Sequence, residues 1–160
     1  MFFWYIGISV LIVVNVFRSV GVDYRLIAIG ALLPLLVDAP VGHRWFGHTL
    51  AFAVALLLGV MISTVGRPRL LRRRLLCVPI GVFCGLVLSG AFASDRVFWW
   101  PARGTAFGAS ALLPAWWAVV IEEVIGLAAC WWVFGQFDLY LPGPRSEFVH
   151  TGRLREGSAT

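Results

Sequence analysis

The chain alternates long apolar runs with short polar connections, and this pattern predicts its secondary structure. Five runs rich in aliphatic and aromatic residues cover residues 2–17, 24–37, 46–65, 75–93 and 112–134. A helix that crosses the hydrocarbon core of a bilayer needs roughly 20 apolar residues. The first run is slightly short of that length, and the second is short and contains Pro34. We therefore expect an all-α, polytopic membrane helix bundle with four to five transmembrane helices over residues 1–135.

The residues around these runs indicate where the helices begin and end. Asp23 is a suitable N-cap for the second run, and Pro114 suits the first turn of the fifth. The first run has no basic segment before it and no small-residue cleavage site, which favours a retained helix over a signal peptide. The chain is polar from Gln136 onward, so residues 136–160 are predicted to be a polar cytoplasmic tail.

The composition supports a membrane location. Of the 160 residues, 60% are hydrophobic and 13% are charged, whereas soluble domains are about 45–50% apolar and 25% charged. Eight Trp and twelve Phe residues are typical of a protein with aromatic residues at the membrane interfaces. The basic residues are all Arg and lie beside the apolar runs. We therefore expect the lipid bilayer, and no nucleic acid, as the partner.

The arginines also predict the orientation in the membrane. The segment 67–74 (RPRLLRRR) contains five arginines and marks the cytoplasmic side. The segment 40–52 (PVGHRWFGHTLAF) lies at the other end of the third run and therefore faces outward. With five spans, the N-terminus is outside the plasma membrane and the C-terminus is cytoplasmic. If the second run is instead a re-entrant hairpin, Arg18 and Arg25 move outside, but the histidine segment stays there.

Two adjacent acidic residues, Glu122 and Glu123, lie inside the fifth run. Ionisable groups within a membrane helix are costly unless they face a protein interior or a wet cavity, so both are candidate catalytic residues. Adjacent helix positions diverge by about 100°, so the two cannot serve one partner equally well. We expect one of them to face the bundle. The alternative is a structural Glu that hydrogen-bonds a neighbouring helix.

Asp38, His43 and His48 have an Asp-x4-His-x4-His spacing near the outer boundary. Carboxylate and imidazole groups bind zinc, and a catalytic zinc needs three protein ligands and an open position for water. The two histidines can converge on one ion if His43 stays in the loop and His48 lies in the first helical turn. The competing interpretation is a set of polar residues at a membrane–water boundary. A divalent metal, zinc first, is the candidate cofactor.

The fourth run carries Gly81, Gly85 and Ser89 at every fourth position, a stripe of small residues that permits close helix packing. This stripe is also the candidate face for a larger membrane-protein partner. The next segment, 95–104 (DRVFWWPARG), combines aromatic and charged residues. We expect it to form an interfacial belt on the same side as the histidines.

Three short motifs lie in the order LLPLLVD (32–38), HRWFGHT (43–49) and FWWPARG (98–104). Their order resembles the YdjM-like family of membrane-bound, metal-dependent hydrolases, and the resemblance extends to small actinobacterial membrane proteins. It covers about residues 30–104. What the resemblance implies is an outward-facing metal site that contains Asp38 and the two histidines of the second motif.

The chain departs from the family pattern at three ligand positions. Leu35, Gly85 and Ser89 stand where the family has metal-binding Asp, His and Asp residues. A further histidine near the family N-terminus is also missing. The resemblance therefore implies a partly lost metal site, to which Glu122 or Glu123 could add a group from the fifth helix.

Two functions are consistent with these features. The first is metal-dependent hydrolysis of a lipid-linked or envelope substrate at the outer face, with Glu122 or Asp38 as the general base. The second is a non-catalytic accessory subunit of a larger membrane or cell-envelope complex. The loss of both ligands in the fourth run favours the second function. Ion transport ranks last, because the chain shows no inverted repeat or paired broken helices.

Overall fold

The computed structural model describes residues 1–17, 22–104 and 110–154. Within these ranges all regular secondary structure is helical, so the all-α prediction is confirmed there. The helices and 3-10 turns are α1 (Phe2–Phe17), α2 (Tyr24–Asp38), η1 (Phe46–His48), α3 (Leu50–Ser63), α4 (Arg69–Leu88), η2 (Ala91–Ala93), α5 (Asp95–Phe98), α6 (Trp116–Gln136) and α7 (Pro142–Thr151).

Each of the five apolar runs corresponds to one long helix, and the differences at their ends have local causes. The third run divides at Thr49, whose Oγ1 accepts a hydrogen bond from the Phe52 N–H at 3.0 Å and caps α3. Helix α4 begins at Arg69, inside the arginine segment, and is longer than its apolar run. Helix α6 begins at Trp116, so Pro114 precedes the helix instead of occupying its first turn.

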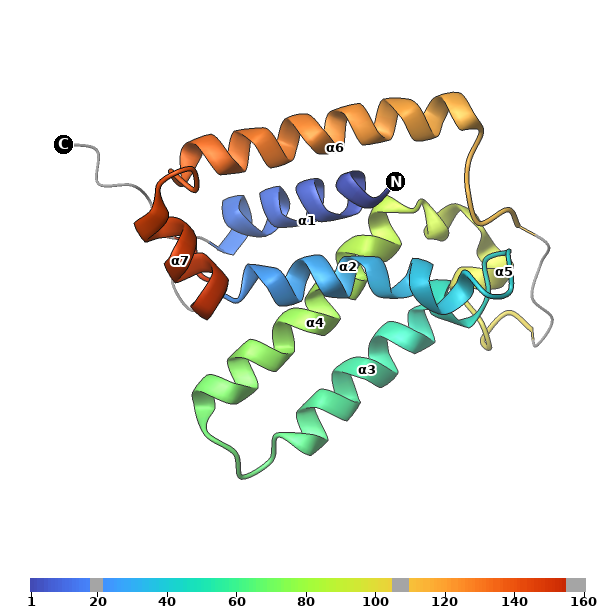
Figure 1. The fold of residues 1–160 in the computed structure, drawn as a ribbon. Coiled ribbons are helices and arrows are strands. Elements are labelled where there is room, and N and C mark those ends of the chain that lie inside the picture. Colours follow the sequence, from blue (N-terminus) through green and yellow to red (C-terminus); the bar gives the residue numbers. More distant parts are fainter. Residues whose placement is uncertain (18–21, 105–109, 155–160) are drawn as a thin grey trace.

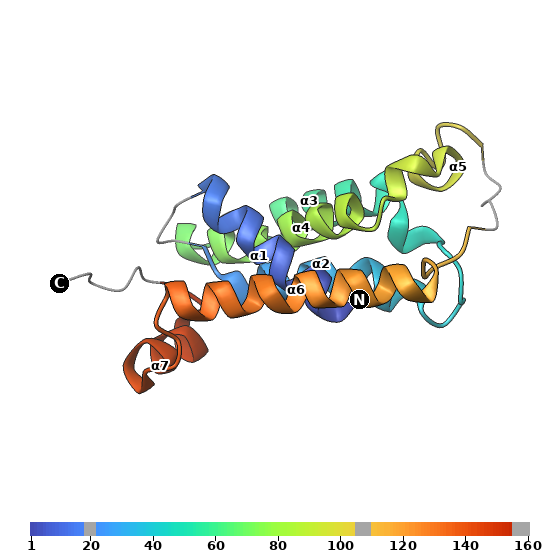
Figure 2. The same cartoon turned by 90° about the horizontal axis from the view of Figure 1, so that it is seen from above.

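The long helices lie in the spatial order α6, α1, α2, α4, α3 (Figure 1). Helix α1 lies between α6 and α2, and α2 packs extensively against α4. Seen from above, α3 and α4 form one side of the bundle and α6 the other (Figure 2). The centre of the fold is therefore the α1–α2–α4 contact.

The two ends of the bundle carry different connections (Figure 1). At the arginine end lie the α3–α4 loop (64–68), the first turn of α4, the start of α2, and α7. At the histidine end lie the α2–α3 connection (39–49), α5 and the start of α6, whereas the N-terminus lies partway along α6. The segments that the sequence assigns to opposite sides of a membrane therefore lie at opposite ends of the molecule.

The stripe of small residues on α4 lies inside the fold. Gly81 and Gly85 are buried against α2, where a Cβ atom at Gly81 would overlap the carbonyl oxygen of Ile27. A Cβ atom at Gly85 would likewise overlap the carbonyl oxygen of Ala31. Close packing at this stripe is confirmed, but the helix that covers it belongs to the same chain. A partner protein would therefore have to use another surface.

Helices α1 and α6 meet in the same way. A Cβ atom at Gly126 would overlap the backbone of Phe3 and Trp4, and one at Gly7 would overlap the carbonyl oxygen of Gly126. Small residues let two helix backbones approach each other closely, which is the usual mode of helix association in lipid. Glycine on α6 thus determines where α1 crosses it.

The tail after α6 packs back onto the bundle. Phe148 and Leu154 pack in the core cluster that α1, α2 and α6 form at the arginine end. The Tyr24 N–H donates a hydrogen bond to the carbonyl oxygen of Gly152 at 2.8 Å. The described part of the tail is therefore a short helix and a return segment that cover the start of α2, and is not only polar surface.

Large apolar side chains remain exposed around the bundle on α1, α3, α4 and α6. Among the described residues, one helix, α6, is long and apolar enough to cross a membrane. Helices α1 and α3 are apolar but shorter. The prediction of four to five transmembrane helices therefore stays a prediction.

Candidate functional site

Asp38 ends α2 and organises the connection that follows it. Its side chain is fully buried. One carboxylate oxygen, Oδ2, accepts a hydrogen bond from the Trp45 N–H at 2.6 Å, and Oδ1 accepts one from the Gly47 N–H at 2.8 Å. Glycine is required at position 47, because a Cβ atom there would lie 2.8 Å from Oδ1 of Asp38. The carboxylate thus folds residues 39–47 back over the end of α2.

His48 is the third partner of this carboxylate. Its Nδ1 lies 2.7 Å from Oδ2 of Asp38, and the His48 side chain is 1% exposed. Turn η1 and the Thr49 cap place His48 immediately before α3. A histidine held through Nδ1 by a carboxylate has a fixed ring orientation, an arrangement also found around metal-binding histidines.

The hydrogen bonds of Asp38 stabilise its ionised form. Burial by itself disfavours a charged carboxylate. The hydrogen bonds from His48, Trp45 and Gly47 favour it. The carboxylate is therefore a buried anion with three protein donors around it.

His43 lies apart from this pair. Its Nδ1 is 3.1 Å from the carbonyl oxygen of Val41, and its backbone forms an isolated bridge with Ala111. The structure therefore brings Asp38 and His48 together but does not add His43. In the described parts of the chain, no group of three or more His, Cys, Asp or Glu side chains is arranged to hold a metal ion. The metal-site hypothesis for Asp38, His43 and His48 stays a prediction.

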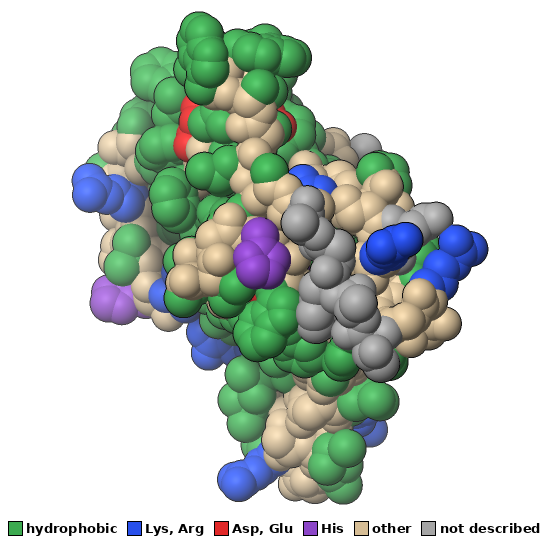
Figure 3. Space-filling view, turned by 90° about the vertical axis from the view of Figure 1, so that its right-hand side faces the viewer, with side chains coloured by type: hydrophobic (Ala, Val, Ile, Leu, Met, Phe, Trp, Pro, Cys, Tyr) green, Lys and Arg blue, Asp and Glu red, His purple; other side chains and the backbone are tan. Residues whose placement is uncertain are grey.

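The face at the histidine end is mostly hydrophobic side chains and backbone, with a few Arg and His side chains and little acidic surface (Figure 3). The aromatic segment 98–100 packs there, where the Trp100 ring meets the Phe46 ring edge-on at a centroid distance of 5.9 Å. Phe46 belongs to η1, and its ring also contacts Phe52 of α3 at 5.5 Å. The predicted aromatic belt therefore covers the turn that carries His48.

Glu123 has a structural role at the start of α1. Its Oε1 accepts a hydrogen bond from the Phe2 N–H at 2.7 Å, and Oε2 accepts one from the Phe3 N–H at 2.9 Å. The carboxylate also forms an ion pair with the amino group of Met1. The first N–H groups of a helix have no partner within the helix. Glu123 satisfies two of them from α6, so it caps α1 across the helix interface.

Glu122 also lies within electrostatic range of the Met1 amino group, and among the described residues its buried Oε2 has no hydrogen-bond partner. It lies within electrostatic range of Arg44 and of the buried Tyr5. Arg44 in turn donates a hydrogen bond from Nη2 to the carbonyl oxygen of Ser89, the C-cap of α4, at 2.7 Å. Glu122 and Arg44 therefore place opposite charges between α6 and the histidine end of α4.

A further charged cluster lies at the arginine end. Asp23 was expected to cap α2, but its side chain makes no capping hydrogen bond. Oδ2 of Asp23 instead lies 3.2 Å from Nη2 of Arg25 and 3.0 Å from Nη2 of Arg74. Burial raises the pKa of Asp23, but the two guanidinium groups outweigh burial and lower it below its ordinary value. Nothing local in the sequence marks the Asp23–Arg74 pair.

Comparisons with protein-family models, with curated proteins and with solved structures found no match to this chain. The resemblance to the YdjM-like hydrolases therefore rests on the three short motifs and stays a hypothesis.

Asp38 accepts three hydrogen bonds, whereas the side chain of His43 makes one within its own loop. We therefore expect substitution of Asp38 to lower the free energy of unfolding more than substitution of His43. Asp38→Ala leaves two backbone N–H groups and a buried imidazole without their acceptor, so we expect the free energy of unfolding to fall by roughly 2–3 kcal/mol. His43→Ala removes one hydrogen bond within its own loop and should cost less than about 0.5 kcal/mol. Equilibrium unfolding in mixed detergent micelles, followed by far-UV circular dichroism, measures both.

Asp38→Asn is the matched variant, because it keeps the shape of the side chain but loses the charge and one acceptor oxygen. Its loss of stability should lie between those of the other two variants. Similar, small effects for Asp38→Ala and His43→Ala would contradict the role assigned to the carboxylate.

Proposed function

We propose that the protein is a multi-pass integral membrane protein of the plasma membrane, and that it acts as a non-catalytic accessory subunit of a larger membrane or cell-envelope complex. The observation that carries the membrane location is the exposed apolar surface of the long helices. Isolated apolar residues are common on soluble surfaces, but contiguous apolar faces indicate a membrane or a protein partner. The bilayer is the solvent that such a bundle requires.

The tryptophans of α6 support a transmembrane orientation of this helix. The Trp116–Trp117 pair lies at its histidine end and the Trp131–Trp132 pair near its arginine end, and all four side chains are exposed. The two pairs are 15 residues apart in the sequence, which corresponds to roughly 22 Å along a helix. Tryptophan concentrates at both membrane–water interfaces. The two pairs therefore mark two interfaces of one bilayer.

The arginines support an orientation with the N-terminus outside. Eight described arginines lie at the arginine end: Arg25, Arg67, Arg69, Arg72, Arg73, Arg74, Arg145 and Arg153. Three lie at the histidine end: Arg44, Arg96 and Arg103. Arg18 and Arg155 lie outside the described residues. The excess at the arginine end assigns that end to the cytoplasm by the positive-inside rule.

The non-catalytic role is supported by what two of the candidate residues, Asp38 and Glu123, contact. Both oxygens of Asp38 accept hydrogen bonds that hold the α2–α3 connection. Both oxygens of Glu123 accept hydrogen bonds from the start of α1. A general base or a metal ligand needs a lone pair directed at substrate or metal, whereas these carboxylates direct theirs at the backbone.

Metal-dependent hydrolysis remains the second candidate function because of one observation. Asp38 holds His48 through Nδ1, which leaves Nε2 as the ring nitrogen that can meet a metal or a substrate. In that function the outward-facing site would contain zinc, and Glu122 would be the candidate base.

Labelling of single cysteines tests the membrane topology. We replace Cys77, Cys84 and Cys130 by Ala and introduce Cys at Val65 or at Ala102, which are exposed at the arginine end and the histidine end respectively. In intact cells a membrane-impermeant maleimide should label Ala102→Cys and spare Val65→Cys, and lysed cells should label both. Labelling of both positions in intact cells, or release of the chain by alkaline carbonate, would contradict a multi-pass span.

Isolation from native membranes tests the accessory role. The tagged full chain, at its native level and in mild detergent, should migrate with a second membrane protein in constant ratio across one size-exclusion peak. The protein mass of that particle should clearly exceed the 17.6 kDa of this chain. A tagged membrane protein of similar size is the control. A particle that contains only this chain would contradict the accessory role.

A further inference from the structure

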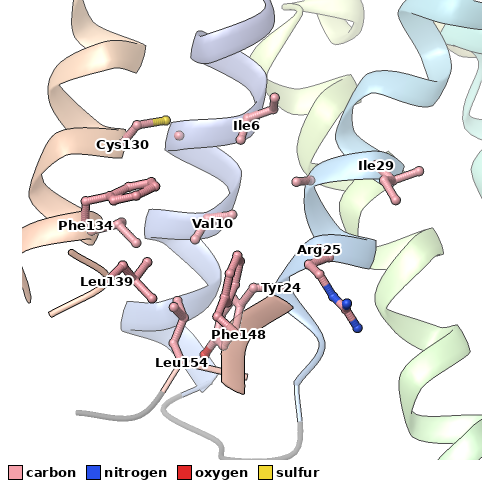
Figure 4. A pocket seen from close by; sticks show the side chains of 13 residues that line it. Ile6, Val10, Tyr24, Arg25, Ile29, Cys130, Phe134, Leu139, Phe148 and Leu154 are labelled. Atoms are coloured by element: carbon pink, nitrogen blue, oxygen red, sulfur yellow. The ribbon is translucent and has the colours of Figure 1, made fainter. Parts of the chain in front are cut away.

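An open apolar pocket of about 310 Å³ lies between α1, α2 and α6 at the arginine end. Its walls are Ile6 and Val10 of α1, Ala28 and Ile29 of α2, and Val133 and Phe134 of α6. Phe148 and Leu154 reach the pocket from α7 and the segment after it (Figure 4). The described side chains present apolar atoms to the pocket. The pocket therefore offers an apolar ligand contacts from three helices.

The pocket runs along the helices and not across them. In Figure 4, Ile6 and Cys130 lie at one end of the pocket, and Leu139, Phe148 and Leu154 lie at the other. The axes of α1, α2 and α6 are roughly parallel in that view, with α2 running opposite to the other two. An extended hydrocarbon chain that lies parallel to the helices, as lipid tails do in a bilayer, fits such a pocket.

Among the described residues that line the pocket, Arg25 is the charged one: its apolar stem lines the pocket, and its guanidinium extends away from the apolar side chains (Figure 4). Its guanidinium donates to both carboxylate oxygens of Asp23, at 3.3 and 3.2 Å, and to the carbonyl oxygen of Val149. These bonds use three of its five N–H donors. Its side chain is 34% exposed, so the group also reaches the surface.

The charge around Arg25 is positive. Asp23 faces two guanidinium groups, those of Arg25 and Arg74, so the three side chains together carry one net positive charge. The other α4 arginines of the same end, Arg69, Arg72 and Arg73, add to it. Anionic phospholipids of the cytoplasmic leaflet are attracted to basic groups at this depth, and basic pockets between membrane helices bind their headgroups.

We infer that this pocket holds one acyl chain of an anionic phospholipid from the cytoplasmic leaflet, with the phosphate group at Arg25. The inference rests on the membrane location in the proposed function. The apolar walls bind the tail, and the guanidinium selects the headgroup. A lipid at this position bridges α1, α2, α6 and α7, and so ties the tail segment to the bundle.

A second apolar pocket provides an internal comparison. It is larger, about 430 Å³, and lies between α3 and α4, with Val54, Leu57 and Phe83 among its lining residues. None of the described residues that line it is charged. If apolar volume alone decided lipid retention, this pocket would retain lipid better and without headgroup preference. The charge at Arg25 predicts the opposite.

Native mass spectrometry of the full chain tests the inference. The protein is placed in bilayers of equal parts phosphatidylcholine and phosphatidylglycerol, extracted in mild detergent, and its bound lipids are counted. We expect one phosphatidylglycerol per chain in preference to phosphatidylcholine. Arg25→Gln should reduce that retention about fivefold, as the loss of one basic group near the headgroup predicts. Arg25→Lys preserves the positive charge and should therefore retain most of the bound phosphatidylglycerol.

Filling the pocket tests the position of the tail. Ala28→Phe places a ring in the pocket and should abolish retention, whereas Val54→Phe in the α3–α4 pocket should leave it unchanged. Ile6→Phe fills the same pocket from α1 and replaces Ala28→Phe if that variant is not folded by circular dichroism and size exclusion. Equal retention in the filled and unfilled proteins, no retained lipid, or equal retention of both phospholipids would overturn the inference.

The experiments distinguish a failure of the lipid site from a failure of the proposed membrane location. A chain that the cysteine labelling shows to span the membrane, but that retains no phosphatidylglycerol, refutes only the lipid site. A chain that carbonate releases from membranes refutes the membrane location itself.

Discussion

The buried carboxylate of Asp38 fixes how the chain passes from α2 to α3, and the histidine end of the molecule depends on that connection. Three hydrogen bonds converge on it, from two backbone N–H groups and from His48. A buried anion without such donors would be very costly, so the carboxylate and the loop stabilise each other. The position of His48 then determines where η1 presents Phe46 to the Trp100 ring. Asp38 and His48 resemble two ligands of a metal site, but their hydrogen bonds hold the α2–α3 connection in place.

Close backbone contacts, a polar cap and buried apolar clusters together hold the long helices in place. Gly81 and Gly85 bring α4 onto α2, and Gly126 brings α6 onto α1. Glu123 then supplies from α6 the acceptors that the start of α1 lacks. If the bundle lies in lipid, as proposed, apolar side chains gain little from leaving the solvent, and close packing and hydrogen bonds weigh more in helix association. Many large apolar side chains of the same helices remain exposed around the bundle.

Hydropathy predicts the five long helices, because the length of an apolar run can be read directly from the local sequence. The stripe of small residues correctly predicts close packing on α4. The pairing of polar groups is not predictable in the same way. Asp23 has the sequence features of an N-cap, yet its carboxylate pairs with Arg74, 51 residues further along the chain. The spacing of Asp38 and His48 fits two metal ligands as well as it fits a hydrogen-bonded pair. Only the fold shows that both oxygens of Asp38 face donors, and that His43 lies elsewhere.

Metal analysis of the full chain, purified from membranes without chelators, tests the structural role of the Asp38–His48 pair most directly. If the pair only clamps the loop, the wild-type protein and His48→Ala should contain the same, far less than stoichiometric, amount of zinc and manganese. One metal ion per chain in the wild-type protein, lost in a His48→Ala variant that keeps its helical circular dichroism, would contradict this role and establish a metal centre.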